Sequence, residues 1–482
     1  MDEIEIIGRE SAKAILDKSL SASKASLVTV YGRRRIGKTY LINCYLRASM
    51  SFHYQGIHNV TTQIQLDKFT RHLSEQLNNR MPLPVPADWF EAFGLLGRLL
   101  QKKRSKKRLV IFLDEFPWMQ TPKSNFLAAF EDFWNTWAAP KHHVTVIICG
   151  SAASWMIQKV VRNKGGLHNR ITHKIVLYPF SLYETELFLK SKKVNLNRYQ
   201  IIQLYMAIGG IPQYLELAEP GMSTVQIIEA ACFRKAGFLY NEFEELYYSL
   251  FNKAERHVSI IRALAARPNG LSRNQIIKAA RLQSGGTTST LLEELSAAGF
   301  ITPYIPFGKK IKDSIYKLTD EYSLFYLKFM EPNRTASKTA WQKIAATPAY
   351  TSWSGLAFET MCIKHTAAIK HALGIAAIYT ESSSWRGAGA QIDLLIDRRD
   401  HCINLCEMKF YGGAFTIDKK YAAALRQKET IFKEHTNTRK QIFFTLITTF
   451  ALNKNEHSIG LVDSVIIADK LFADIKDGME NQ

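Results

Sequence analysis

The sequence predicts a multidomain α/β protein, and three observations support this fold class. The chain has 482 residues, which is too long for one ordinary hydrophobic core and suggests about three domains. Short apolar runs alternate with helical patterns in the first half, as in a parallel sheet. The pattern then changes twice, first to three helices with a hairpin and then to a helix at residues 354–373 with alternating strands, the first of them at residues 375–382. We therefore predict domains of residues 1–253, 254–335 and 336–482.

Composition narrows the class of protein. The residues are 46% hydrophobic and 22% charged, as in a globular protein. No stretch of about 18 uncharged apolar residues appears, so we expect no membrane span. The first residues lack the basic-then-apolar order of a secretory signal. Six cysteines occur without a CxxC pair, which fits a reducing cytoplasm. We therefore expect a cytoplasmic protein.

The formal net charge of +20 is the strongest compositional signal. An excess of Lys and Arg of this size favours a polyanionic partner, most simply nucleic acid, through neutralisation of phosphates. The alternative is a protein that is merely basic, and charge alone leaves the two interpretations open.

The first segment has five apolar runs that read as strands of a parallel sheet. Helical patterns follow from about residue 180 to residue 250, and we expect them to form a lid on the sheet. The predicted strands are residues 26–31, 51–57, 109–113, 144–149 and 174–177.

The turn after the first apolar run matches the pattern GxxxxGK[ST] and leads into a helix, which is the context that the motif requires. Its glycines let backbone N–H groups point inward around phosphates, and the helix N-terminus adds a favourable dipole. Lys38 would reach the β and γ phosphates and Thr39 would ligate Mg²⁺. The sequence thus predicts an ATP-binding P-loop. Its residues are Gly32, Arg33, Arg34, Arg35, Ile36, Gly37, Lys38 and Thr39.

A second motif supports the ATP site. Four apolar residues, 110–113, end in Asp114 and Glu115. Asp114 would hold the Mg²⁺ shell and Glu115 would polarise an attacking water. A buried strand that happens to end in acids is the alternative, and the two motifs together favour the ATPase. Ser151 follows the next strand, where a polar residue can sense the γ-phosphate.

The strand at residues 51–57 separates the two motifs, and this layout resembles the AAA+ and STAND branch of P-loop ATPases. Arg162 and Arg170 follow at positions where such proteins place phosphate-sensing arginines. We take Arg170 as a candidate, with an ordinary surface arginine as the alternative. AAA+ modules often assemble into rings with arginines supplied in trans, whereas the STAND-like branch acts as monomers until triggered. The resemblance therefore makes a homo-oligomer one of two expectations.

The order of motifs along the chain resembles a group of prokaryotic AAA-like ATPases. The shared features are the GRRRIGKT loop, the LDEFPWM strand and the GGIPQYL turn. In that group a winged helix and a nuclease-like domain follow the ATPase. Residues 254–335 fit the winged helix, since three helical patterns precede a hairpin around Gly308. Lys309, Lys310 and Lys312 favour phosphate contact, so backbone binding or domain coupling is expected rather than sequence-specific recognition.

Two short segments near the C-terminus look like a PD-(D/E)xK nuclease core of the restriction-endonuclease-like α/β fold. The resemblance implies that Asp393 and Glu407 bind Mg²⁺ or Mn²⁺, and that Lys409 helps to activate water. Glu359 matches an extra acid near the metal, with a helix-surface glutamate as the equal alternative. Ile392 stands where the motif has proline. Retained cleavage therefore remains open.

The register of the predicted hairpin decides whether these groups meet. A turn centred on Asp400 places Asp393 opposite Glu407 and puts Lys409 on the face of Glu407. A two-residue turn at Arg399 and Asp400 would instead place Cys406 opposite Asp393.

Three hypotheses of function follow. In the first, ATP binding or hydrolysis gates a metal-dependent nuclease that acts on DNA. In the second, the chain is a nucleotide-driven switch or scaffold whose last domain binds nucleic acid or protein without cleavage. A less favoured third is a transcription regulator that works through the winged helix.

Overall fold

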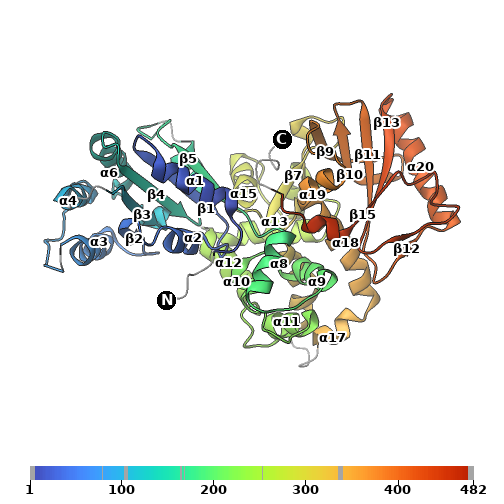
Figure 1. Ribbon diagram of the computed structural model, residues 1–482, viewed down its shortest axis with the longest axis horizontal. Coiled ribbons are helices and arrows are strands. Elements are labelled where there is room, and N and C mark those ends of the chain that lie inside the picture. The colour runs from blue at the N-terminus through green and yellow to red at the C-terminus, as the bar shows by residue number, and fades with distance from the viewer. Residues whose placement is uncertain are drawn as a thin grey trace. The chain divides into compact units, whose positions relative to one another are not determined.

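The computed structural model describes residues 6–78, 80–102, 107–162, 165–167, 169–251, 253–334 and 340–475. The chain divides into two compact units, Met1–Tyr178 and Pro179–Gln482. The helices that follow Tyr178 therefore belong by their contacts to the second unit. Figure 1 colours the elements of both units along the chain.

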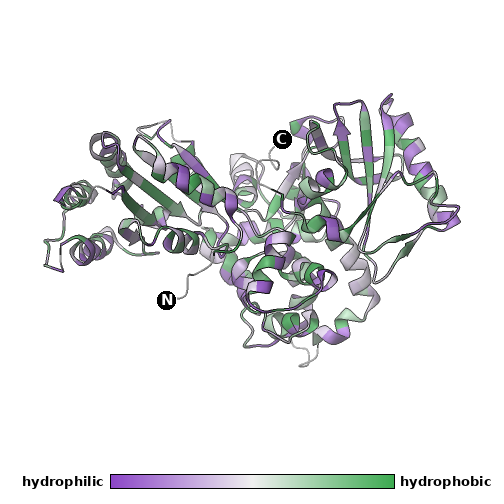
Figure 2. Ribbon diagram, viewed as in Figure 1, coloured by the Kyte–Doolittle hydropathy of each residue, from purple (hydrophilic) through white to green (hydrophobic). Residues whose placement is uncertain are grey.

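The first unit is built on a five-stranded sheet in the order β2-β3-β4-β1-β5, and all of its strand pairs are parallel. Every residue of β1, β3 and β4 is buried, as expected for strands covered on both faces. Figure 2 shows these central strands as strongly hydrophobic. The strands are β1 Ser26–Gly32, β2 Met50–Gln55, β3 Leu109–Asp114, β4 Val144–Gly150 and β5 His173–Leu177.

Helices cover this sheet through apolar faces. Trp89 and Phe93 of α4 contact Phe69 of α3 and Phe126 of α6, so an aromatic cluster joins three helices. The helices are α1 Glu10–Ser21, α2 Lys38–Tyr45, α3 Thr62–Leu77, α4 Trp89–Lys102, α5 Phe116–Met119, α6 Phe126–Asp132, η1 Phe133–Ala138, α7 Ala153–Trp155 and η2 Met156–Val161. All five predicted strands are present, and the predicted parallel sheet is confirmed.

The second unit begins with a group of helices. Three of them start with a capping box, in which a Ser or Asn side chain and a Glu or Gln three residues later satisfy backbone N–H groups at the helix start. These helices are α8 Leu182–Ser191, α9 Arg198–Ile208, α10 Pro212–Leu215, α11 Thr224–Ile228, η3 Glu229–Phe233 and α12 Glu242–Leu250.

The next segment forms three helices and a small antiparallel sheet in the order β6-β8-β7. The predicted hairpin is confirmed as β7 and β8, and β6 pairs with β8 as a third strand. The elements are α13 Ala254–Ala265, β6 Leu271–Ser272, α14 Arg273–Ala279, α15 Gly286–Ala297, β7 Ile301–Tyr304, η4 Ile311–Asp313 and β8 Ile315–Leu318. Helices α16 Glu321–Phe325, η5 Tyr326–Met330, η6 Glu331–Asn333 and α17 Ala340–Ala345 follow.

The last segment holds a mixed five-stranded sheet in the order β15-β13-β11-β10-β9. Strands β9, β10 and β11 are antiparallel, whereas β11, β13 and β15 are parallel. The sheet strands are β9 Thr380–Gly387, β10 Ala390–Arg398, β11 Cys402–Lys409, β13 Gln441–Thr448 and β15 Ser464–Ile467. Its other elements are α18 Pro348–Lys364, α19 Thr366–Ala372, β12 Phe415–Thr416, α20 Lys419–Thr436, β14 Leu452–Asn453 and η7 Ala468–Phe472.

Two predicted elements of this segment have different bounds. The single helix expected at residues 354–373 is two helices, because α18 ends at Lys364 and α19 begins at Thr366. The intervening His365 is buried, its Nδ1 lies 2.8 Å from the Met361 carbonyl oxygen, and its Nε2 accepts a hydrogen bond from the Leu182 backbone N–H. The strand expected at residues 375–382 begins only at Thr380.

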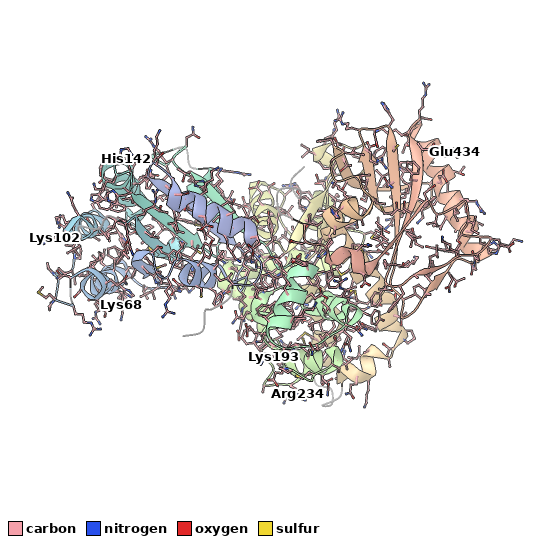
Figure 3. The ribbon with its side chains drawn as sticks, in the orientation of Figure 1. Lys68, Lys102, His142, Lys193, Arg234 and Glu434 are labelled. Atoms are coloured by element: carbon pink, nitrogen blue, oxygen red, sulfur yellow. The ribbon has the colours of Figure 1, made fainter. Side chains whose placement is uncertain are left out.

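Within the described ranges, no helix is long and apolar enough to cross a membrane. Charged side chains cover many different elements. Figure 3 shows Lys68 and Lys102 extending from the first unit and Lys193 and Arg234 from the second. These four basic residues lie on separate elements.

Candidate functional site

The P-loop follows β1 directly and turns sharply at three residues with positive φ. These are Gly32 at 148°, Arg35 at 72° and Gly37 at 83°. A Cβ atom on Gly32 would lie 2.2 Å from the Leu177 carbonyl oxygen, so only glycine fits there. A Cβ atom on Gly37 would meet nothing within 4 Å, which leaves open space at the start of α2. The loop therefore has the backbone shape and the room that a phosphate chain requires.

Lys38 lies inside this loop and is 5% exposed. Its Nζ donates hydrogen bonds to the carbonyl oxygens of Gly32 (3.1 Å) and Arg33 (2.7 Å). Burial lowers the pKa of Lys38, while Cys149, Glu115 and Asp114 act in the opposite direction. A buried ammonium group that donates to neutral carbonyls gains from exchanging them for phosphate oxygens.

Thr39 and Asp114 meet at the ends of α2 and β3. The Thr39 hydroxyl donates to Asp114 Oδ2 at 2.7 Å, and the Glu115 backbone N–H donates to Asp114 Oδ1 at 2.9 Å. Asp114 is fully buried, and both of these donors are uncharged. A hydroxyl oxygen and a carboxylate that share one point are ligands suited to Mg²⁺, so these residues fit that ion.

Glu115 is held in place by Ser151 at the end of the neighbouring strand β4. Glu115 Oε1 accepts from the Ser151 hydroxyl (2.8 Å), and Oε2 accepts from the Ser151 backbone N–H (3.2 Å). Burial raises the pKa of Glu115, although Lys38 and the Ser151 hydrogen bonds act against this rise. Since β4 lies between β1 and β3, the loop, Asp114, Glu115 and Ser151 lie along one edge of the sheet.

The remaining predicted nucleotide residues differ in position. Arg33 is buried in the loop, and Arg34 and Arg35 are half-buried. Arg170 is exposed in the turn before β5, and within the part of the chain that is described no hydrogen bond or ion pair joins it to the loop. By contrast, the charge of Arg162 acts on Tyr31 of β1, whose pKa is raised mainly by burial. A nucleotide contact of Arg170 stays a prediction.

Sequence reasoning missed Arg9 and Cys149. The Arg9 guanidinium donates to the carbonyl oxygens of Tyr178 (2.6 Å) and Ile36 (3.1 Å), and so ties the start of α1 to the P-loop. The sequence feature that could have pointed to Arg9 is its position immediately before the first amphipathic helix. Burial raises the pKa of the Cys149 thiol well above its usual value, and Asp114 adds to this effect. The thiol next to Asp114 is therefore neutral.

The C-terminal hairpin has one of the two predicted registers. Leu394 pairs with Cys406 and Leu395 with Leu405, and this register continued by one residue brings Asp393 opposite Glu407. The turn centred on Asp400 is therefore confirmed. The pairing of β10 with β9 is irregular between Ile392 and Leu395, next to Asp393. Such irregularities often redirect a side chain beside a functional site.

Glu407 is bound on both carboxylate oxygens by groups of this chain. Oε1 accepts from the Tyr421 hydroxyl at 2.7 Å and lies 3.1 Å from Lys409 Nζ. Oε2 accepts from Lys428 Nζ at 2.6 Å. Burial would raise the pKa of Glu407, but Lys428 and Lys409 outweigh it and hold that pKa below its usual value. Lys428 and Tyr421 were also missed, although their spacing of seven residues places them on one face of α20.

Glu359 lies on α18 beside this pair. Its pKa is raised to about 7, first by burial and then by the charges of Asp393 and Glu407, while Lys409 and Lys317 oppose the rise. The charges of two carboxylates therefore act on a third one here. All four predicted residues of the C-terminal site lie in one electrostatic group, and their roles stay predictions.

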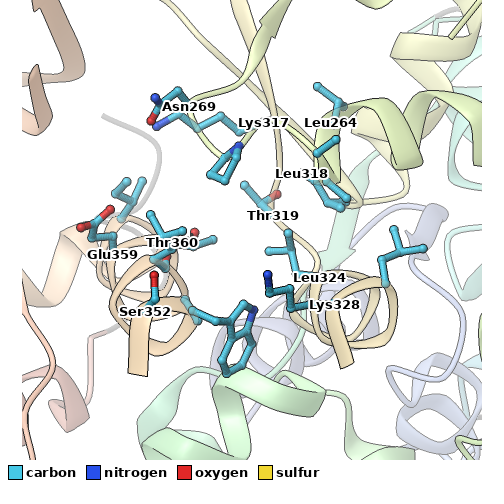
Figure 4. A pocket seen from close by; sticks show the side chains of 18 of the residues that line it. Leu264, Asn269, Lys317, Leu318, Thr319, Leu324, Lys328, Ser352, Glu359 and Thr360 are labelled. Carbon is cyan, nitrogen blue, oxygen red and sulfur yellow. Dashed lines mark hydrogen bonds between the residues drawn. The ribbon is translucent and has the colours of Figure 1, made fainter. Parts of the chain in front are cut away.

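A cleft of about 600 Å³ lies between the small three-stranded sheet and α18. Its lining includes Glu359, Asp393, Lys317 and Lys328, with mainly apolar walls. Figure 4 shows Glu359 of α18 on one side, and Lys317 of β8 together with Asn269 on another. The Gln391 side chain donates both to Asn269 Oδ1 (3.0 Å) and to Asp393 Oδ1 (2.5 Å), which links the two walls.

The C-terminal acids already have partners within this chain, so a divalent ion would have to displace them. Among the residues that the structure describes, no three His, Cys, Asp or Glu side chains lie close enough together to hold a metal ion. Both oxygens of Glu407 are already bound to Lys409, Lys428 and Tyr421. Two of these three partners are lysines.

The hairpin tip between β7 and β8 packs against the last sheet. The Phe307 backbone N–H donates to the Ser384 carbonyl oxygen at 2.8 Å, and the Phe307 ring lies 5.5 Å from the ring of Phe432 on α20. Lys309 and Lys310 at the same tip are exposed. One end of the hairpin thus joins two parts of the second unit while its lysines face solvent.

Residues 7–218 match the family model of an ATPase domain found predominantly in Archaea. This chain carries a P-loop ATPase domain. The match spans the whole parallel sheet and extends into the first helices of the second unit. It agrees with the convergence of Lys38, Thr39, Asp114 and Glu115 at one sheet edge.

Several proteins are similar to this ATPase over longer stretches. An uncharacterized protein of Methanocaldococcus jannaschii is 23% identical over 392 residues, which is 81% of this chain and 83% of the relative. A Walker-type ATPase of Pyrococcus abyssi is 18% identical, with a TM-score of 0.47 over 67% of this chain and 96% of that one.

The ORC2 protein of Aeropyrum pernix, solved with ADPNP and ADP, is 15% identical, with a TM-score of 0.43 over 76% of this chain and 98% of that one. Both TM-scores lie below 0.5. The assignment of the ATPase domain therefore rests on the family match and on the residues around the loop.

Proposed function

We propose that this chain is a Mg²⁺-dependent ATPase that acts together with nucleic acid, in particular DNA. The observation that carries the proposal is the 2.7 Å hydrogen bond between Thr39 and Asp114, directly beside the buried Lys38. These two oxygen ligands come from the two motifs that bind and hydrolyse nucleotide in P-loop proteins.

Each residue of the edge has a separate task. Lys38 exchanges the loop carbonyls for phosphate oxygens when ATP binds. Glu115 polarises the attacking water, and Ser151 orients the Glu115 carboxylate through two hydrogen bonds. Thr39 and Asp114 would hold the Mg²⁺, which would supply positive charge next to the phosphates.

The direct test is phosphate release from ATP by the full chain, with Mg²⁺ or with EDTA. We expect turnover only with Mg²⁺, and a loss of turnover in Asp114→Asn. Turnover that persists in EDTA, or at the wild-type rate in Asp114→Asn, would refute the assignment of Asp114.

The proposed role of nucleic acid rests on the net charge of +20 and on the second unit. We assign residues 254–335 as a winged helix, residues 180–253 as a helical lid and residues 336–482 as a restriction-endonuclease-like domain. Phe307 couples the hairpin to the last domain, while Lys309 and Lys310 contact phosphates. Fluorescence anisotropy with labelled duplex DNA at several salt concentrations tests this role. Binding that does not weaken with salt would contradict phosphate contact.

Two further proposals concern the setting of the ATPase. We place it in the cytoplasm, since its cysteines are unpaired within the described ranges. A homo-oligomer would allow Arg170 to act on the nucleotide of a neighbouring copy. Sedimentation velocity with and without a non-hydrolysable ATP analogue tests assembly, and a monomer in both conditions would exclude that role of Arg170.

A second candidate function is a metal-dependent nuclease gated by ATP. It is favoured by the placement of Asp393 opposite Glu407, with Lys409 beside them. Plasmid DNA with Mg²⁺ or Mn²⁺, with and without ATP, tests it in the wild type and in Lys409→Ala. Cutting that needs Lys409 supports the nuclease. Absence of cutting with intact ATP turnover makes the C-terminal domain a binding module of a nucleotide-driven switch.

A further inference from the structure

The Glu407 carboxylate carries two lysine partners from different elements. Lys409 follows Glu407 by two residues on β11, so both side chains leave the strand on the same face. Lys428 comes from α20 and lies closer, at 2.6 Å compared with 3.1 Å. The side chains are 28% exposed for Lys409, 22% for Lys428 and 15% for Glu407. Solvent screening of this group is therefore weak.

Helix α20 fixes the position of Lys428. Tyr421, Leu425, Lys428 and Phe432 recur at helical spacing on the face that packs on the sheet. Leu425 and Phe432 are buried in the same core as β10 and β11. Phe307 from the hairpin packs on Phe432, one turn from Lys428. The backbone of Lys428 is thus held, and its ammonium group reaches Glu407 from a rigid base.

Lysines from several elements act on the acids of the site. Glu359, Asp393 and Glu407 supply the carboxylates, and Lys317, Lys409 and Lys428 supply ammonium groups that act on them. A divalent ion brought to Glu407 would meet ammonium groups on both carboxylate oxygens. At this depth, repulsion between neighbouring cations is larger than at an open surface.

We infer that Lys428 is an internal cation that blocks metal binding at the C-terminal site, because its ammonium group occupies the position on Glu407 that a divalent ion requires. The Lys409 ammonium group stays beside Glu407 when an ion binds. The Lys428 ammonium group has to leave Glu407 before an ion can bind. Lys428 is a positioning residue: its place determines whether the Glu407 carboxylate binds an ammonium group or a metal ion. The inference concerns ion binding alone, so it holds whether or not the domain cleaves DNA.

The test is calorimetric titration of the full chain with Mn²⁺ in the absence of nucleotide. We expect Lys428→Met to bind Mn²⁺ roughly tenfold or more tightly than the wild type, because one repelling charge is removed. The gained affinity disappears in Lys428→Met with Glu407→Gln. Equal affinity of wild type and Lys428→Met, or a gain that survives Glu407→Gln, overturns the inference.

A matched control lies on the same helix. Lys433 pairs with Glu429 at 2.6 Å and is 49% exposed, so Lys433→Met removes a charge from α20 without touching Glu407. We expect its Mn²⁺ affinity to equal that of the wild type. An equal gain in both variants would show a general effect of charge and would refute a specific role of Lys428.

A second measurement covers the case in which Lys428→Met does not fold. Acetylation of lysines in the wild type, followed by mass spectrometry, reports access to each ammonium group. Saturating Mn²⁺ should increase the labelling of Lys428 severalfold and leave Lys433 unchanged. Unchanged labelling of Lys428 at saturating Mn²⁺ overturns the inference.

Discussion

Each unit places a carboxylate near the end of a strand, fully buried for Asp114 and partly buried for Glu407, but the two carboxylates are compensated differently. Asp114 of the first unit accepts hydrogen bonds from a hydroxyl and a backbone N–H, both of which are neutral. Glu407 of the second unit is bound by two ammonium groups and a tyrosine. The Lys38 ammonium also acts on Asp114, but it donates to loop carbonyls and not to the carboxylate. We therefore expect Asp114 to stay available to a cation, whereas the lysines bound to Glu407 compete with one.

The largest effect that we expect is on ATP turnover by the first unit, and it tests this comparison first. Lys38→Ala should lower ATP turnover about 100-fold or more, because the buried ammonium group that contacts the phosphates is lost. Phosphate release at saturating ATP measures the change. Lys68→Ala on α3, where the lysine is exposed, is the matched control and should keep wild-type turnover. Turnover within a few-fold of wild type in Lys38→Ala would contradict the site.

Substitutions of Glu115 and of Ser151 should lower ATP turnover by different amounts. Glu115→Gln removes the group that polarises water and should lower turnover about 100-fold. Ser151→Ala removes only the hydroxyl that orients Glu115, so we expect roughly a tenfold loss. ATP binding, measured by calorimetry, should stay near wild type in both variants. Equal losses in the two variants would show that Ser151 does more than orient Glu115.

The C-terminal acids give a smaller, pH-dependent effect on stability. The folded pKa of Glu359 is about 7, above its usual value of 4.5. The stability present below pH 4.5 is therefore lost as the pH rises through 7, where Glu359 ionises in the folded chain.

Glu359→Gln removes this loss and should raise the free energy of unfolding at pH 8 by about 1–2 kcal/mol. Thermal unfolding midpoints in EDTA should coincide for the two proteins at pH 4.5 and diverge at pH 8. A constant difference across that range would contradict the crowding of the acids.

The smallest effect concerns the exposed hairpin lysines. Lys309→Ala with Lys310→Ala should weaken duplex DNA binding severalfold and reduce the slope of affinity against salt by roughly 2. Anisotropy titrations at several salt concentrations measure both quantities. Lys193→Ala, on an exposed turn after α8 in the same unit, serves as the control. An unchanged slope in the double variant would place the DNA contact elsewhere.

The sequence predicted well what depends on neighbouring residues. The P-loop, the acids after β3 and the parallel strands follow from local motifs and apolar runs. The opposition of Asp393 and Glu407 follows from alternation about Asp400. What it missed depends on residues distant in the chain. Arg9 reaches Ile36 across the sheet edge, and Lys428 reaches Glu407 from a helix 21 positions away.

The predicted bounds of the helix near His365 and of the strand near Thr380 also differ from those in the structure. Tertiary contacts explain the first case, since the buried His365 bonds to Leu182 far along the chain. Helical periodicity alone continues through that position, and no local signal marks the break.

Equilibrium binding of Mn²⁺ to the full chain, with a saturating non-hydrolysable ATP analogue, tests the contrast between the two sites most directly. We predict one tightly bound ion per chain, lost in Asp114→Asn and kept in Asp393→Asn. A second ion of similar affinity that disappears in Asp393→Asn would show that the C-terminal site holds metal in its resting state, and it would contradict the account.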